Sequence, residues 1–400
     1  MLHPTKINIQ KWITSLFFLS CLFPFVSPAP IQADLQPLFF VFAVIIVSYQ
    51  AWRVGLSKKE YFLIAVSLIF LIYIDPGREY RVDIGKTVSL LAGVLTYIAI
   101  TKIDNKQAFK LVKIAALVYF CFSCLIFLNS EVFLGIQKYF VRAINVTDIT
   151  NLKYRGTPTL ATEPGLLGGL LVFLLIQLRY YGKMANASAQ EMLVHGVAIV
   201  LTIVMTKSGT GYFYLLIFFM LTYGNWIPRS RFVGLGLLAA VLIVLAIVVP
   251  IIASLELDNR GFQILITLFS GGNLDADTSV LRRLYDIRIG IASLFDYPFG
   301  VGINGVSAAV NELAVRHDLI REQDFAGEIS LVSGLSYYFV SYGLFGVLFI
   351  LYLFFFVSRA PLLHKVFALI YLSASYSPAF PAIWILLSQA SKKKMRPVAD

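Results

Sequence analysis

The sequence predicts an all-α polytopic integral membrane protein with 11–12 transmembrane helices. Of its 400 residues, 58% are hydrophobic and only 14% are charged, and the mean hydropathy is +0.80. Soluble domains carry about 25% charged residues, so this composition excludes an ordinary soluble domain. Long apolar runs recur along the chain without the alternation of barrel strands. Helices are then the structures that provide hydrogen bonds for all backbone N–H and C=O groups across ~30 Å of hydrocarbon.

The apolar runs predict spans at 12–31, 35–52, 61–74, 87–101, 111–128, 164–181, 193–206, 209–225, 232–254, 334–357 and 363–390. The first run follows two lysines, as in a signal peptide, but with ten more spans behind it we expect an uncleaved anchor. The last run contains Pro378 and Pro381. Because proline breaks the helical hydrogen-bond ladder, we expect a hairpin of two short helices there, which favours twelve crossings.

The distribution of charge predicts the orientation. If the N-terminus is cytoplasmic, the cytoplasmic segments hold more than half of the 33 Lys and Arg residues but few of the 22 acids. This is the positive-inside pattern, and it places both termini in the cytoplasm. The net charge of +11 is therefore explained by topology, and no basic stripe with interleaved aromatic residues indicates a nucleic-acid partner.

Within a single membrane domain, residues 1–400, the polar residues gather in outer segments 75–86, 129–163 and 255–330. The last segment is a long periplasmic loop with six arginines and eleven acids. Structureless loops of that length are uncommon unless they are functional. Its apolar residues at helical spacing predict an interfacial helix, with the polar residues on the side facing headgroups or the site. The apolar positions are Leu281, Leu284, Ile287, Ile291 and Leu294, and the polar ones are Arg282, Arg283, Asp286 and Ser293.

The stretch "RGTPTLATEP" precedes the span at 164–181. Pro164 suits the first turn of a helix, which makes Glu163 its N-cap, where the helix dipole favours a carboxylate. Capping explains Glu163 but not Arg155, so a catalytic or acceptor-binding role for Glu163 stays open beside the capping role. Gly165 and Gly169 predict a face for close helix packing.

Four segments occur in the order "YRGTPTLATEPGLLGGLL", "TKSGTGYFYLL", "DTSVLRRLYDIRIGIASLFDYPFGVGING" and "YGLFGVLFIL". This series, over roughly residues 85–390, resembles the O-antigen and exopolysaccharide repeat-unit polymerases (Wzy-type) and, more distantly, the O-antigen ligases. The resemblance implies a GT-C-like helical fold in the bacterial inner membrane. It implies a glycosyltransferase that joins oligosaccharide units carried on undecaprenyl diphosphate at the periplasmic face. Lipid, and a chain-length regulator protein, are further expected partners, and no metal or other cofactor is implied.

The family's pattern matches particular residues here. An arginine before the Glu-Pro helix matches Arg155, and the glutamate matches Glu163. The arginine before the P-x-G-x-G turn matches Arg283, with Arg282 as the adjacent option, and an Arg-x10-Gly spacing fits Arg316. Ligases carry a histidine about a dozen residues before the "YG-fG" turn, and its absence here favours a polymerase.

Transfer from a lipid diphosphate requires a group that holds the leaving diphosphate and a base for the acceptor hydroxyl. Arginine suits the first task because its planar fork bonds phosphate oxygens in pairs, and Arg155, Arg283 and Arg288 are the candidates. A surface ion pair is the alternative for each. For the base we expect Glu163 or His317, the latter being otherwise a solvated loop histidine.

Two other interpretations stay open. Asp275 and Asp277 in "DAD" could hold a divalent ion, although a helix-capping turn also explains them. A transporter or flippase of lipid-linked oligosaccharide is the rival function. The absence of an internal repeat and the concentration of charge on the outer face favour an enzyme.

Overall fold

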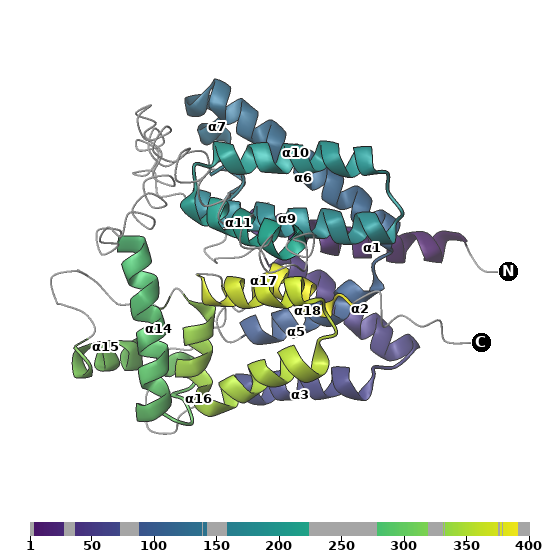
Figure 1. Cartoon of the computed structure of the whole chain (residues 1–400). Helices are drawn as coiled ribbons and strands as arrows, with labels where there is room; N and C mark the ends of the chain where they lie inside the picture. Colours follow the sequence, from purple (N-terminus) through teal and green to yellow (C-terminus); the bar gives the residue numbers. More distant parts are fainter. Residues whose placement is uncertain are drawn as a thin grey trace, which may run out of the picture. The chain divides into compact units, whose positions relative to one another are not determined.

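The computed structural model describes residues 4–27, 37–72, 88–137, 139–141, 158–223, 278–318, 331, 333–374, 377 and 379–390. Every regular element among these residues is a helix, apart from one isolated antiparallel bridge between Val26 and Val141. The prediction of an all-α chain is therefore confirmed for the described residues. They divide into two compact units, and Figure 1 labels their helices.

The first unit comprises Met1–Pro24, Pro37–Ile103 and Thr278–Asp400. Its helices are α1 (Pro4–Leu22), α2 (Leu38–Arg53), α3 (Lys58–Ile72), α5 (Ser89–Ala99), α14 (Thr278–Asp296), α15 (Val306–Arg316), α16 (Gly334–Tyr352), α17 (Leu362–Ser373) and α18 (Pro381–Ser388). Short turns extend three of them: η1 (Ile100–Lys102) after α5, η5 (Ile303–Gly305) before α15 and the π-helical η6 (Leu353–Val357) after α16.

Helix α5 of the first unit packs against α2, α3 and α18. Most of its residues are buried, and Gly93 lies directly beneath the indole of Trp384 in α18. A Cβ atom at Gly93 would lie 2.1 Å from that ring, closer than any carbon contact allows. The absence of a side chain at this position therefore lets α18 approach α5.

The second unit comprises Phe25–Gln36 and Asp104–Asp277. It contains α6 (Asn105–Leu128), α7 (Ser130–Gln137), α9 (Pro164–Met184), α10 (Ala189–Met205) and α11 (Gly209–Tyr223). Helix α9 is buried throughout residues 167–178 because α6, α10 and α11 all pack on it. An ion pair between Lys113 and Glu191 also joins α6 to α10.

The close crossing of α9 and α11 lies at Gly168, and not at the predicted Gly165. A Cβ atom at Gly168 would lie 2.7 Å from the Cα of Gly211, whereas one at Gly165 would meet nothing nearer than 3.9 Å. A glycine of α9 thus lies at a close helix contact as predicted, but it is Gly168, and the predicted Gly165 does not make this contact. Which glycine stands at the contact depends on where α11 packs against α9, and a pattern within α9 alone does not contain that information.

The helices support a membrane protein. Among the described residues three are long and apolar enough to cross a bilayer: Asn105–Leu128, Pro164–Met184 and Gly334–Val357. Six shorter apolar helices accompany them. The predicted hairpin at 363–390 is confirmed as two short helices, α17 and α18, that pack against each other with Pro381 opening the second. The predicted span at 232–254 lies outside the described residues, and the number of crossings stays a prediction.

Candidate functional site

Helix α14 is the amphipathic helix predicted in the long outer loop, and it packs against α16 (Figure 1). The two helices meet at Gly290, where a Cβ atom would lie 2.9 Å from the side chain of Ser336. Asp286 and Ser293 are buried, at 2% and 0% exposure. The Asp286 carboxylate accepts a hydrogen bond of 2.8 Å from the backbone N–H of Ser333, the N-cap of α16. Asp286 thus ties α14 to α16, while the buried Ser293 hydroxyl donates to the carbonyl of Gly290 in its own helix. The prediction that these two residues face headgroups or the site was therefore wrong.

The opposite side of α14 exposes a stripe of large apolar residues. It consists of Leu284 (46% exposed), Ile287 (40%), Ile291 (49%) and Phe295 (81%). Successive helical residues are rotated by about 100°, so Arg283 and Arg288 lie at the two edges of this stripe. An apolar stripe edged by arginines is typical of a helix at the bilayer surface, with its cations reaching toward headgroup phosphates.

The two arginines differ in their surroundings. Arg283 is half-buried, and Arg288 is exposed and makes no hydrogen bond or ion pair with any residue of the described chain. The alternative of a surface ion pair therefore does not account for Arg288. The side chain of Arg282 lies outside the described residues, as does the whole of Arg155.

Helix α16 is broken at Gly343, where φ is +55° and ψ is −136°. The break removes helical partners from nearby backbone groups, which must be satisfied elsewhere if they are buried. The loop between α14 and α15 provides them through three hydrogen bonds. These run from the N–H of Val301 to the carbonyl of Val340 (3.0 Å), from Gly302 to Ser341 (2.9 Å) and from Leu344 to Pro298 (2.8 Å).

Glycines permit this contact. A Cβ atom at Gly343 would lie 2.2 Å from the carbonyl oxygen of Pro298, and one at Gly300 would lie 2.4 Å from that of Ser341. Gly300 and Gly302 also have positive φ values of +78° and +73°. The "YPFGVG" turn and the "YGLFG" turn, which the sequence presents as separate motifs, are therefore two sides of one backbone junction.

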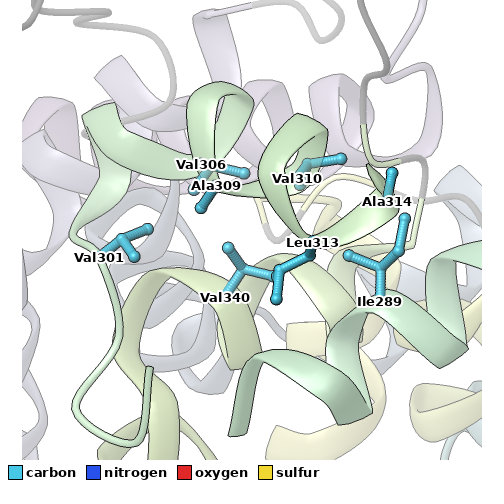
Figure 2. Packing of buried hydrophobic residues seen from close by; sticks show 8 residues of the cluster. All are labelled: Ile289, Val301, Val306, Ala309, Val310, Leu313, Ala314 and Val340. Carbon is cyan, nitrogen blue, oxygen red and sulfur yellow. The ribbon is translucent and has the colours of Figure 1, made fainter. Parts of the chain in front are cut away.

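Helix α15, which the sequence did not predict, is fixed by an apolar cluster shared with α14 and α16. Figure 2 shows Val310 and Leu313 of α15 grouped with Val340 of α16 and Ile289 of α14, and all four are 0% exposed. The cluster joins α14, α15, α16 and the connecting loop into one block. It places the C-terminal ends of α14 and α15 within contact distance of each other, as the ion pairs between them show.

A charged cluster lies where these two ends meet. His317, which follows α15, forms a 2.6 Å hydrogen bond from Nε2 to Oδ2 of Asp296, the last residue of α14. Arg316 lies 3.6 Å from the same carboxylate oxygen and donates a 2.6 Å hydrogen bond to Glu312. The fold thus brings Asp296 against the predicted site residues Arg316 and His317, which are neighbours in the sequence. The guanidinium of Arg316 is shared between the carboxylates of Asp296 and Glu312.

Glu163 belongs to the second unit, at the start of α9. It occupies the N-cap position with extended backbone angles (φ −143°, ψ 148°), and Pro164 is the first helical residue, as predicted. Its side chain, however, is exposed and makes no capping hydrogen bond. Capping through the side chain therefore does not explain why a carboxylate stands here, and the weaker attraction to the helix dipole is what remains of that role.

Sequence reasoning missed Asp296 and the structural role of Asp286. Both are single acids in a loop with eleven, so no spacing distinguished them. Asp275 and Asp277 lie outside the described residues, as does Gly327, the glycine that completes the Arg-x10-Gly spacing from Arg316. Within the parts of the chain that are described, no three His, Cys, Asp or Glu side chains are grouped as a metal site would require. No protein family, characterised protein or solved structure matches this chain.

Proposed function

We propose that this protein is a glycosyltransferase that polymerises oligosaccharide repeat units carried on undecaprenyl diphosphate at the periplasmic face of the bacterial inner membrane. The observation that carries the proposal is the block formed by α14, the P-x-G-x-G turn and the break in α16. Two of the segments on which the family resemblance rests pack together in this block. A structural reason for the two motifs to occur in one chain supports reading them as one site.

The exposed stripe of α14 supports a lipid-linked substrate. Leu284, Ile287 and Ile291 offer an apolar surface for acyl chains, while Arg283 and Arg288 stand at its edges. A guanidinium at the bilayer surface can bind diphosphate oxygens through paired hydrogen bonds. As the sugar leaves the lipid, charge develops on those oxygens, and fixed cations aimed at developing charge usually make the largest contribution to catalysis.

The acceptor hydroxyl needs a base, for which Glu163 and His317 are the candidates. Glu163 is exposed and has no capping hydrogen bond to occupy it. His317 is 38% exposed and is oriented by a carboxylate. Both are residue types that ordinarily serve as general bases.

A transporter or flippase of lipid-linked oligosaccharide is the second candidate, and the broken helix α16 is the observation that favours it. Transporters use broken helices to present free backbone carbonyls to ions or substrates. Here the carbonyls of Val340 and Ser341 beside the break accept hydrogen bonds from the loop. They are occupied by the fold, so the break gives more support to a structural junction than to a transport site.

The test is reconstitution of the purified protein in liposomes with lipid-linked repeat units from the source cell. A polymerase yields a ladder of longer lipid-linked products and releases undecaprenyl diphosphate. A flippase moves the unit across the bilayer without chain growth, and a ligase transfers it only when a lipid A core acceptor is added. An Arg288→Ala variant with an unchanged melting temperature serves as the control that removes a side chain of the site without disturbing the fold. No other described residue makes a hydrogen bond or ion pair with that side chain.

A further inference from the structure

The hydrogen bond between His317 and Asp296 has a defined direction. An ionised carboxylate only accepts hydrogen bonds, so Nε2 of His317 carries the proton that is shared with Oδ2 of Asp296 at 2.6 Å. In the neutral imidazole, Nδ1 then carries the lone pair. Nδ1 makes no hydrogen bond within the described part of the chain, and the side chain is 38% exposed. The histidine thus presents an unoccupied acceptor nitrogen to the surroundings.

The position of Asp296 is not explained by helix stability. It is the last residue of α14, where the dipole disfavours an acid and favours a base. Its carboxylate is only 20% exposed, and its nearest cations are His317 and Arg316 at the end of α15. The shared apolar cluster holds the two helix ends in place, so the carboxylate stands on a rigid support.

We infer that Asp296 is a positioning residue that holds His317 with Nδ1 outward, and that His317 is the general base of the transfer reaction. This inference rests on the proposed function. It assigns the base to one of the two candidates. The arrangement is that of a base oriented by a third group, which is the usual way in which a histidine is held in one tautomer.

The acceptor hydroxyl oxygen bonds to the anomeric carbon of the donor sugar while the bond from that carbon to the lipid diphosphate oxygen breaks, and the diphosphate keeps the electron pair. Nδ1 of His317 takes the hydroxyl proton. The resulting imidazolium is stabilised by Asp296. The neighbouring charged groups are Arg316, which contacts Asp296 and Glu312, and Asp318, which is next in the chain. The proton leaves to water before the next cycle.

The activity test uses full-length protein in liposomes, with kcat and KM for the acceptor measured separately. Loss of a general base costs ~10²–10⁴-fold in rate. We expect that loss in kcat for His317→Gln, and at least a tenfold loss for Asp296→Asn, with little change in KM. The double variant should be no slower than His317→Gln, because the two residues act as a unit.

Matched controls separate this role from a general effect of substitution. His195→Gln removes a histidine whose Nδ1 lies 2.8 Å from a carbonyl of its own helix, and Asp104→Asn removes the charge of the carboxylate that caps α6 while keeping an oxygen that can accept the capping hydrogen bond. Neither belongs to the proposed site, and both should keep kcat within about twofold. Melting temperatures of all variants identify any that fail to fold.

A spectroscopic test does not depend on the reaction. In protein labelled with ¹⁵N-histidine, the signals assigned to His317 by their absence from His317→Gln should show the Nε2–H tautomer when the imidazole is neutral. Asp296→Asn should move them toward a mixture of tautomers. An Nδ1–H tautomer in the unsubstituted protein would overturn the inference.

The outcomes distinguish the inference from the function on which it rests. If the unsubstituted protein forms no polymer under any of the conditions, the proposed function fails, and the tautomer still reports on the pair. If it forms polymer and His317→Gln does so at an equal rate, the function stands and the assignment of the base is wrong. A folded Asp296→Asn variant with unchanged kcat would likewise remove Asp296 from the mechanism.

Discussion

Substituting Gly343 by alanine tests the junction between α16 and the turn before α15. The Cβ atom would stand 2.2 Å from the carbonyl oxygen of Pro298, so the turn must move. The junction holds three backbone hydrogen bonds, each contributing ~0.5–1.5 kcal/mol, or roughly 1.5–4.5 kcal/mol together. Strain at a positive φ of +55° adds about 1–3 kcal/mol. Against a typical total stability of ~5–15 kcal/mol this is a large loss.

Gly55 provides the matched control. It also has a positive φ, +82°, but a Cβ atom there would meet nothing within 4 Å. Gly55→Ala therefore carries the strain without the clash. We expect the free energy of unfolding of Gly343→Ala to be about 2–4 kcal/mol lower than that of Gly55→Ala.

Two measurements check this difference: thermal unfolding in detergent, and hydrogen exchange at the amides of Val301, Gly302 and Leu344. Exchange there should be at least tenfold faster in Gly343→Ala and unchanged in Gly55→Ala. Equal melting temperatures and equal amide protection in the two variants would refute the reasoning from the junction.

Three further predictions concern the site and its support. Arg283→Lys and Arg155→Lys keep the charge but lose the paired hydrogen bonds to phosphate, so polymer formation should fall at least tenfold with unchanged protein level, and normal chain length in both would remove them from the site. Glu163→Gln should keep the melting temperature, because the side chain makes no capping hydrogen bond, and it should raise the KM for the acceptor. An unchanged chain-length distribution would leave Glu163 only its interaction with the helix dipole. Gly168→Ala should destabilise the second unit by ~1–3 kcal/mol through overpacking against Gly211, while Gly165→Ala, with 3.9 Å of room, should not. Thermal unfolding of the two variants measures the difference, and equal stability would contradict a close contact of α9 and α11 at Gly168.

The sequence alone determined the helical class and most helix positions, because both follow from local pattern. Apolar runs located α9, α11 and α16 within a few residues, and two prolines predicted the break between α17 and α18. The 3.6-residue spacing of Leu284, Ile287 and Ile291 was enough to predict α14 as an amphipathic helix. These patterns depend only on residues close to one another in the sequence and on the apolar environment of a bilayer.

Tertiary structure alone decided how the polar residues of the candidate site are used. Asp286 and Arg288 are two residues apart on one helix, yet one is buried against α16 and the other is exposed at the edge of the apolar stripe. Asp296 acquires its partner 21 residues away only because the apolar cluster brings α15 back against α14. Local periodicity predicts which side of a helix is apolar. It contains no information about which neighbour covers that side or which distant charge meets it, because those depend on contacts between segments far apart in the chain.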